Sequence, residues 1–138
     1  MKPIENNSVK PGGSMRQEKV QYFTEKEEEF INLLIRIGTK KNVATVLVFL
    51  ASTLKATGLA IERGTGLRQP EVSMAMKYLM EQGWIKSCGS PSEHKTRPSK
   101  VYELAKSITE IMECIEKENK IKVNKQLALV KKLRNYID

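Results

Sequence analysis

The sequence predicts a mainly helical α+β fold with one two-stranded β-hairpin and a long C-terminal helix. Three observations lead to this prediction. Apolar residues recur at helical spacing in four segments before residue 83. Two strand-like runs then flank a polar loop between residues 84 and 104. Residues 106–138 contain neither Gly nor Pro and repeat apolar residues every three or four positions.

The composition is that of an ordinary soluble chain. Hydrophobic residues make up 40% and charged residues 29% of 138 residues, enough for a core without disulfides or metal. Cys88, Cys114 and the single His94 are too few for a disulfide framework or a recognisable zinc site. No run of about 18 apolar residues occurs, and the N-terminus lacks a signal-peptide pattern. We therefore expect a cytoplasmic protein with no metal, no cofactor and no membrane segment.

The chain divides into three parts. Residues 1–16 combine Pro and Gly with almost no apolar content, which predicts a disordered N-terminal tail. Residues 17–105 hold the predicted globular domain, and residues 106–138 form a separate helical segment. In the globular domain the first helix begins at Thr24, which forms a capping box with Glu27.

A second helix is predicted over residues 42–52. It is apolar on most sides, which indicates burial, although its valines leave a strand as the alternative. A short helix capped by Thr57 follows, and Gly64 is expected to stop it. The segment from Gly64 to Gly66 is then a tight turn, and Leu67 is expected to return to the core.

The next helix, over residues 69–82, has the clearest boundaries. Gln69 is expected at its N-cap, Pro70 at its first position and Gly83 just beyond its end. Its apolar residues fall on one side of a helical wheel and are predicted to be core: Val72, Ala75, Met76 and Leu79. The opposite side is free to meet a partner.

Residues 84–88 and 100–104 are expected to pair as a hairpin whose tip is the basic loop 89–98. The segment 106–138 would span roughly 45–50 Å as one helix, at about 1.5 Å per residue. A break near residues 119–124, giving two helices, is the alternative. Because no further sequence covers its apolar stripe, a second subunit is expected to do so, which predicts a homodimer.

Two helices joined by a short turn and followed by a basic-tipped hairpin make a winged helix-turn-helix. In this arrangement the second helix, here 69–82, enters the DNA major groove, while the wing 89–98 reaches flanking phosphates. The net charge of +8 and the pI of about 9.5 suit a polyanionic partner. The predicted DNA contacts are Arg68, Gln69, Pro70, Ser73, Met74 and Lys77 on the helix and Lys95, Arg97 and Lys100 on the wing.

The run from Glu62 to Ile85 resembles the helix-turn-helix core of MarR-, ArsR- and TrmB-type transcriptional regulators, and is most similar to archaeal regulators of that kind. The likeness lies in the Thr65-Gly66-Leu67 turn, in Ser73 at mid-helix and in the exit from Leu79 to Ile85. It implies a dimeric winged-helix DNA-binding protein that dimerises through its terminal helices. The sequence departs from these families at Met74 and Tyr78, where basic residues are common.

The function predicted from these features is sequence-specific binding of double-stranded DNA by a transcriptional regulator. An enzyme is not expected, since no paired-carboxylate site, catalytic triad or phosphate-binding loop can be placed. One alternative is a winged helix that serves as a protein–protein interaction module in a transcription or replication complex. Another is a regulator that responds to a small-molecule effector or to oxidation, for which Cys88 beside Lys86 is the candidate thiol.

Overall fold

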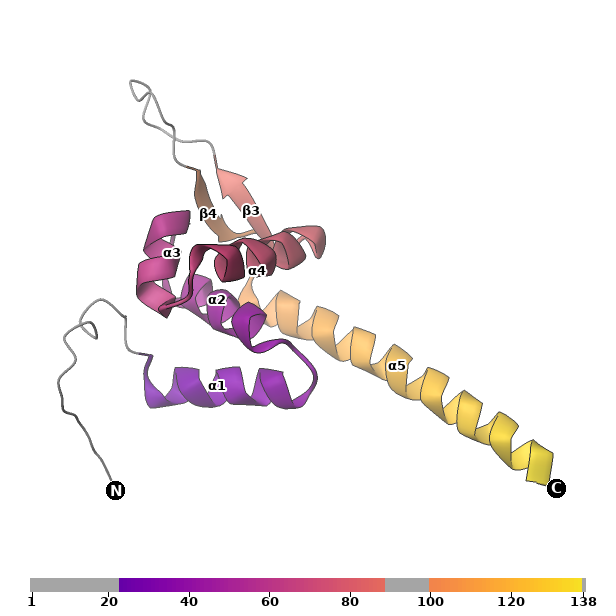
Figure 1. The fold of residues 1–138 in the computed structure, drawn as a ribbon. Helices are drawn as coiled ribbons and strands as arrows, with labels where there is room; N and C mark the ends of the chain where they lie inside the picture. Colours follow the sequence, from indigo (N-terminus) through magenta and orange to yellow (C-terminus); the bar gives the residue numbers. More distant parts are fainter. Residues whose placement is uncertain (1–22, 89–99, 138) are drawn as a thin grey trace.

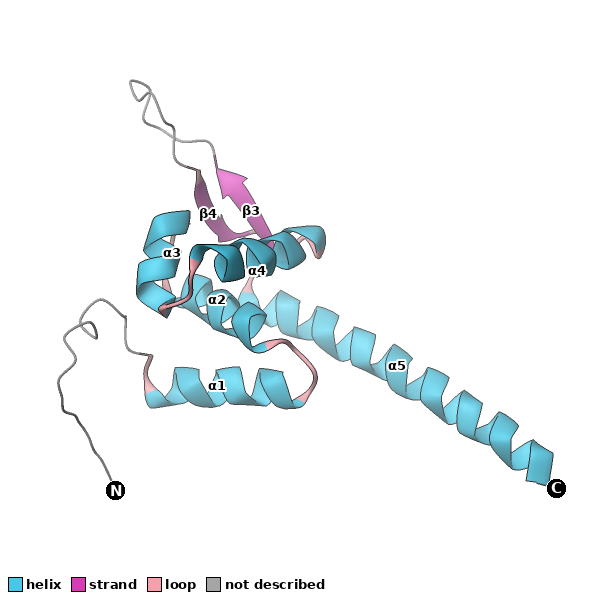
Figure 2. Ribbon diagram, in the orientation of Figure 1, coloured by secondary structure: helices cyan, strands magenta, loops and turns pink. Residues whose placement is uncertain are grey.

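The computed structural model describes residues 23–88 and 100–137, and Figure 1 shows their arrangement. In chain order the elements are α1 (Glu25–Arg36), α2 (Lys41–Ser52), β2 (Ala56–Thr57), α3 (Gly58–Thr65), α4 (Gln69–Glu81), β3 (Ile85–Cys88), β4 (Val101–Leu104) and α5 (Ile108–Ile137). This is the predicted winged-helix architecture, with a small sheet beside the helices (Figure 2). The predicted tail 1–16 and the wing tip 89–98 lie outside the described residues.

Reciprocal caps begin two of the helices. The Glu27 N–H donates to Thr24 Oγ1 at 3.1 Å, and the Thr24 N–H donates to Glu27 Oε1 at 2.9 Å, which confirms the predicted capping box. Ser107 and Glu110 form the same pair at the start of α5. This cap explains why α5 begins at Ile108 and not at residue 106.

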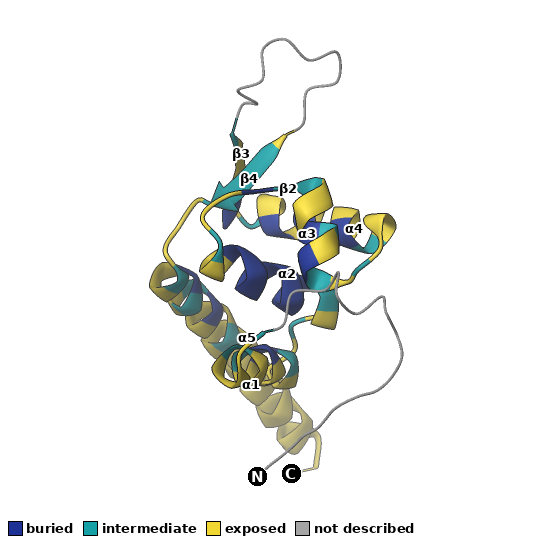
Figure 3. Cartoon of the chain, turned by 90° about the vertical axis from the view of Figure 1, so that its left-hand side faces the viewer, coloured by how far each residue is buried: buried dark blue, intermediate teal, exposed yellow. Residues whose placement is uncertain are grey.

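The core is built around α2. Every residue from Val43 to Leu50 is buried, because α1, α3 and α4 pack around this helix (Figure 3). Even Thr45 is accommodated, since its hydroxyl donates to the Lys41 carbonyl at 2.8 Å. The segment is thus a helix, and the strand alternative is excluded: a helix surrounded by other helices tolerates an apolar sequence on all its sides.

The predicted end of α3 at Gly64 is wrong. The helix runs through Gly64 to Thr65, and Gly66 ends it in the left-handed conformation with φ 78°. Gly64 is a glycine for a different reason: a Cβ on it would overlap the Phe49 ring of α2. This contact lets α3 approach α2 closely, and Leu67 then packs against the core as expected.

The start of α4 differs by one residue from the prediction. Its N-cap is Arg68, not Gln69, so Pro70 occupies the second helical position. The Arg68 N–H donates to Glu71 Oε1 at 2.8 Å, which closes the first turn. The helix ends at Glu81, and Gly83 follows with φ 77°. All four predicted core residues of this helix, Val72, Ala75, Met76 and Leu79, are buried.

The sheet has three strands in the order β2-β4-β3, all antiparallel. The β3–β4 hairpin was expected; the two-residue strand β2, in which Ala56 pairs with Tyr102, was not. Two residues are too few to show a periodicity in sequence. The hairpin is anchored by Trp84, which is buried and meets the Tyr78 ring edge-on at 6.2 Å between centroids.

The C-terminal segment is one uninterrupted helix of 30 residues, as predicted, and the alternative of a break near residues 119–124 is excluded. Its first two turns join the core through Ile111 and Ile115. Beyond them it extends away from the domain, and every residue from 120 to 137 is exposed (Figures 1 and 3). Among the described residues, no helix is both apolar enough and long enough to span a bilayer.

Candidate nucleic-acid interface

The six DNA-contact residues predicted on and beside α4 are all exposed. Within the helix, spacings of three and four residues set Pro70, Ser73, Met74 and Lys77 on one side, opposite the buried face. Arg68 and Gln69 lie at the N-terminal end of that side. Met74 is the most prominent apolar member, with 73% of its surface exposed. The described part of the chain therefore leaves this face open for a partner.

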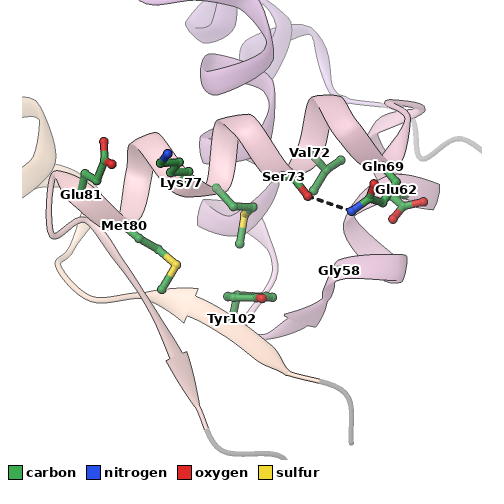
Figure 4. A pocket seen from close by; sticks show the side chains of 10 residues that line it. Gly58, Glu62, Gln69, Val72, Ser73, Lys77, Met80, Glu81 and Tyr102 are labelled. Carbon is green, nitrogen blue, oxygen red and sulfur yellow. Dashed lines mark hydrogen bonds between the residues drawn. The ribbon is translucent and has the colours of Figure 1, made fainter. Parts of the chain in front are cut away.

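Two of these side chains bond to each other. Gln69 Nε2 donates to Ser73 Oγ at 2.8 Å, one helical turn further along (Figure 4). The sequence predicted Gln69 and Ser73 as two separate hydrogen-bonding groups. Their spacing of four positions was the only signal that they would meet.

One flank of α4 forms a groove with α3 and β4 (Figure 4). Its volume is about 530 Å³, and Tyr102 of β4 lies across it from Lys77 and Met80. Carboxylates of Glu62 and Glu81 also line it. Glu62, Met80 and Tyr102 were not among the predicted site residues, because they come from three elements whose proximity depends on the tertiary fold.

The other flank of α4 faces the start of α2 across a second groove of about 560 Å³. Tyr78 lies here, and its ring also contacts Trp84. Partial burial, with a smaller contribution from the negative charge of Glu118 on α5, raises the pKa of the Tyr78 hydroxyl. Tyr78 thus lies on a flank of α4 and packs against its own domain, which accounts for an aromatic residue at this position.

The wing is described only at its base. Lys100 is exposed just before β4, on the strand that leads out of the wing. Lys95 and Arg97 lie outside the described residues, so their predicted contacts stay predictions. Figure 1 shows β3 and β4 running outward beside α4, so that the base of the wing and α4 are neighbours.

The candidate redox thiol at the base of the wing is hydrogen-bonded to a carboxylate. Cys88 Sγ donates to Glu103 Oε2 at 3.2 Å, and Lys86 Nζ lies 3.6 Å from the same oxygen. The hydrogen bond to Glu103 raises the pKa of Cys88, and the opposing effects of Lys55 and Lys86 are smaller. The same bond lowers the pKa of Glu103. Lys86 does favour ionisation of this thiol, but the carboxylate between them has the larger, opposite effect.

No family model matches this sequence, and no curated protein does. Among solved structures, the fold is similar to one titled "Multiple Antibiotic Resistance Repressor, MarR", with a TM-score of 0.50 and 12% sequence identity over 75% of this chain and 73% of that chain. A second similar structure is Pex from Synechococcus sp. (strain PCC 7942), with a TM-score of 0.39 and 20% identity over 58% of this chain and 82% of that chain. The first likeness shows a MarR-like winged-helix fold; the second is too distant to carry an argument.

Proposed function

We propose that this chain is a homodimeric transcriptional regulator that binds specific sites in double-stranded DNA. The observation that carries the proposal is the open outer face of α4, beside the strands β3 and β4 that bound the predicted wing in sequence. A helix with its side chains is about 10–12 Å across and fits a major groove about 12 Å wide. The MarR-like fold and the net charge of +8 support the same function.

The proposed contacts divide by chemistry. Arg68 and Lys77 donate to phosphates or to guanine, while Gln69 and Ser73 meet base edges. Met74 contacts a thymine methyl group, and Pro70 packs against the DNA backbone. From the wing, Lys95, Arg97 and Lys100 bind flanking phosphates, which adds affinity without adding sequence preference.

The partner subunit is proposed to cover the apolar stripe of α5. The stripe starts on the face that Ile111 and Ile115 bury in the domain, and it continues into residues that are exposed: Val123, Leu127, Val130, Leu133 and Ile137. Exposed apolar residues in such a row indicate a protein interface. A two-fold dimer would then place one α4 in each of two successive major grooves.

The distribution of charge supports the proposal that α5 contacts α1 of the second copy. Residues 117–134 of α5 carry seven basic side chains against Glu118 alone. The first turns of α1 carry Glu25, Glu27, Glu28 and Glu29 against Lys26, and the exposed Leu33 and the C-cap residue Ile37 follow. Opposite charges around two exposed apolar surfaces favour pairing between them.

The test is binding to random-sequence duplex DNA across a salt series. Each lost phosphate contact should reduce the slope of log K against log salt by about 0.9. We expect Lys77→Ala and Arg97→Ala to weaken binding at low salt and to flatten this slope. Lys106→Ala removes the same charge from the exposed turn between β4 and α5, outside the proposed DNA and dimer contacts, and serves as the matched control.

Equal binding by wild type, Lys77→Ala and Arg97→Ala at low salt would exclude these contacts. No measurable binding by the wild type would favour the alternative, a winged helix that serves as a protein-interaction module. The exposed Met74 and the opposing charges of Glu71 and Glu81 favour this second candidate. Similarity to archaeal regulators and control by a small-molecule effector stay predictions from the sequence.

A further inference from the structure

The hydrogen bond between Gln69 and Ser73 changes what the N-terminal end of α4 can recognise. Gln69 is the first residue of the helix, and Ser73 lies one turn later. Both side chains are exposed, yet they bond to each other at 2.8 Å. The backbone beneath them is held as well, since Glu71 accepts the Arg68 N–H at 2.8 Å.

The bond leaves a defined set of groups on the Gln69 amide. A glutamine amide has two N–H donors and one carbonyl acceptor. Ser73 Oγ takes one donor, so one N–H and the carbonyl Oε1 remain free. The remaining donor and the acceptor belong to one planar amide, and together they match a base edge that offers the reverse pair.

Adenine is the base with that edge in the major groove. It presents the N7 acceptor next to the N6 donor, whereas guanine presents two acceptors, N7 and O6. Cytosine presents one donor, and thymine one acceptor and a methyl group. A glutamine therefore pairs with adenine through two hydrogen bonds, and the N-terminal residues of a recognition helix are those that reach base edges.

We propose that Gln69 recognises an adenine in the major groove and that Ser73 is a positioning residue, which holds the Gln69 amide in place before DNA binds. This inference rests on the DNA-binding function proposed above and names the base that the helix reads. Holding a long side chain in one rotamer beforehand reduces the entropy lost when the complex forms. Ser73 thereby affects base preference through Gln69, even without touching the base.

Selection of bound sites from a random duplex pool tests the proposal with the full-length wild type, Gln69→Ala, Ser73→Ala and Ser73→Thr. The wild type should enrich an adenine at one position of each half-site. Gln69→Ala should lose that enrichment. Ser73→Ala should reduce it severalfold, and Ser73→Thr, which keeps the hydroxyl, should restore it.

A modified base then tests the geometry directly. Replacing the selected adenine by 7-deazaadenine removes the N7 acceptor and should weaken the wild type by roughly 2- to 10-fold, because one of the two hydrogen bonds of the bidentate contact is lost. Gln69→Ala should be insensitive to this replacement. A wild type that tolerates 7-deazaadenine, or a Ser73→Ala protein with unchanged adenine enrichment, would overturn the inference.

The two proposals fail in different ways. The wild type could bind DNA and select a site whose bases do not depend on Gln69 or Ser73. That result would exclude only the assignment of adenine to Gln69. Failure of the wild type to bind duplex DNA at any salt concentration would exclude both the proposed function and this inference.

Discussion

The described chain contains two helical regions that differ in what stabilises them. In the domain up to Ile115, helices bury their apolar faces in one core, and Ile111 of α5 is fully buried. Further along the same helix, Leu133 has 64% of its surface exposed. The two residues belong to one continuous α5, so helical pattern alone does not determine burial. What differs is whether another element of the same chain lies opposite.

The contrast has an energetic meaning. Most of the stability of helices in proteins comes from packing an apolar face against another element. The domain supplies that packing for the start of α5, and a second copy is proposed to supply it for the rest. The stability of the domain should therefore be intrinsic, whereas that of distal α5 should depend on protein concentration.

Truncating a core residue should produce the largest effect. Leu79 on α4 is fully buried, so Leu79→Ala should lower the free energy of unfolding by about 2–5 kcal/mol. Leu133→Ala makes the same chemical change on distal α5 and should leave the unfolding of the domain nearly unchanged at low concentration. Urea denaturation followed by circular dichroism measures both. Similar losses in the two variants would mean that distal α5 packs within its own chain.

A charge placed in the α5 stripe should separate the subunits. Val130→Asp would bury an unpaired carboxylate at the proposed interface and weaken self-association on the order of 100-fold, about 3 kcal/mol. Ala128→Asp puts the same charge on the opposite, exposed side of the helix. Light scattering across a dilution series should show a monomer only for Val130→Asp. A wild type that is monomeric throughout would remove the basis of the dimer.

The close contact between α3 and α2 gives a smaller test within the domain. Gly64→Ala inserts a methyl group into the Phe49 ring and should cost about 1–3 kcal/mol. Gly58 begins the same helix with open space around it, so Gly58→Ala should be neutral or stabilising by about 0.4–1 kcal/mol. Thermal unfolding of the two variants distinguishes the positions. A harmless Gly64→Ala would show that the Phe49 ring can move aside.

The smallest effect concerns the base of the wing. Because the pKa of Cys88 is raised, its thiolate should form at higher pH than that of free cysteine, and alkylation at pH 8 should be slow. Glu103→Ala removes the main cause and should speed the reaction. Lys86→Ala removes a charge that lowers this pKa and should slow it. Alkylation rates that ignore both changes would mean that the Glu103 hydrogen bond does not control the thiol.

The sequence predicted the parts that depend on near neighbours. The Thr24 cap, the buried face of α4 and the Gly83 end of that helix all follow from spacings of one to four residues, which the helix geometry converts directly into contacts. The six exposed candidates on and beside α4 follow from the same geometry, since they lie opposite the apolar face. Their binding to DNA remains a prediction.

Contacts between distant residues were decided only by the tertiary structure. Strand β2 exists because Ala56 meets Tyr102, and the Cys88 thiol is restrained by Glu103 across the hairpin, which depends on the strand register. The sequence predicted Gly64 to be a turn residue, but its lack of a side chain is explained by the Phe49 ring that packs against it. Local sequence patterns specify which residues face inward. Which of these inward-facing residues contact each other depends on how the helices and strands pack together. A short stretch of sequence does not contain that information.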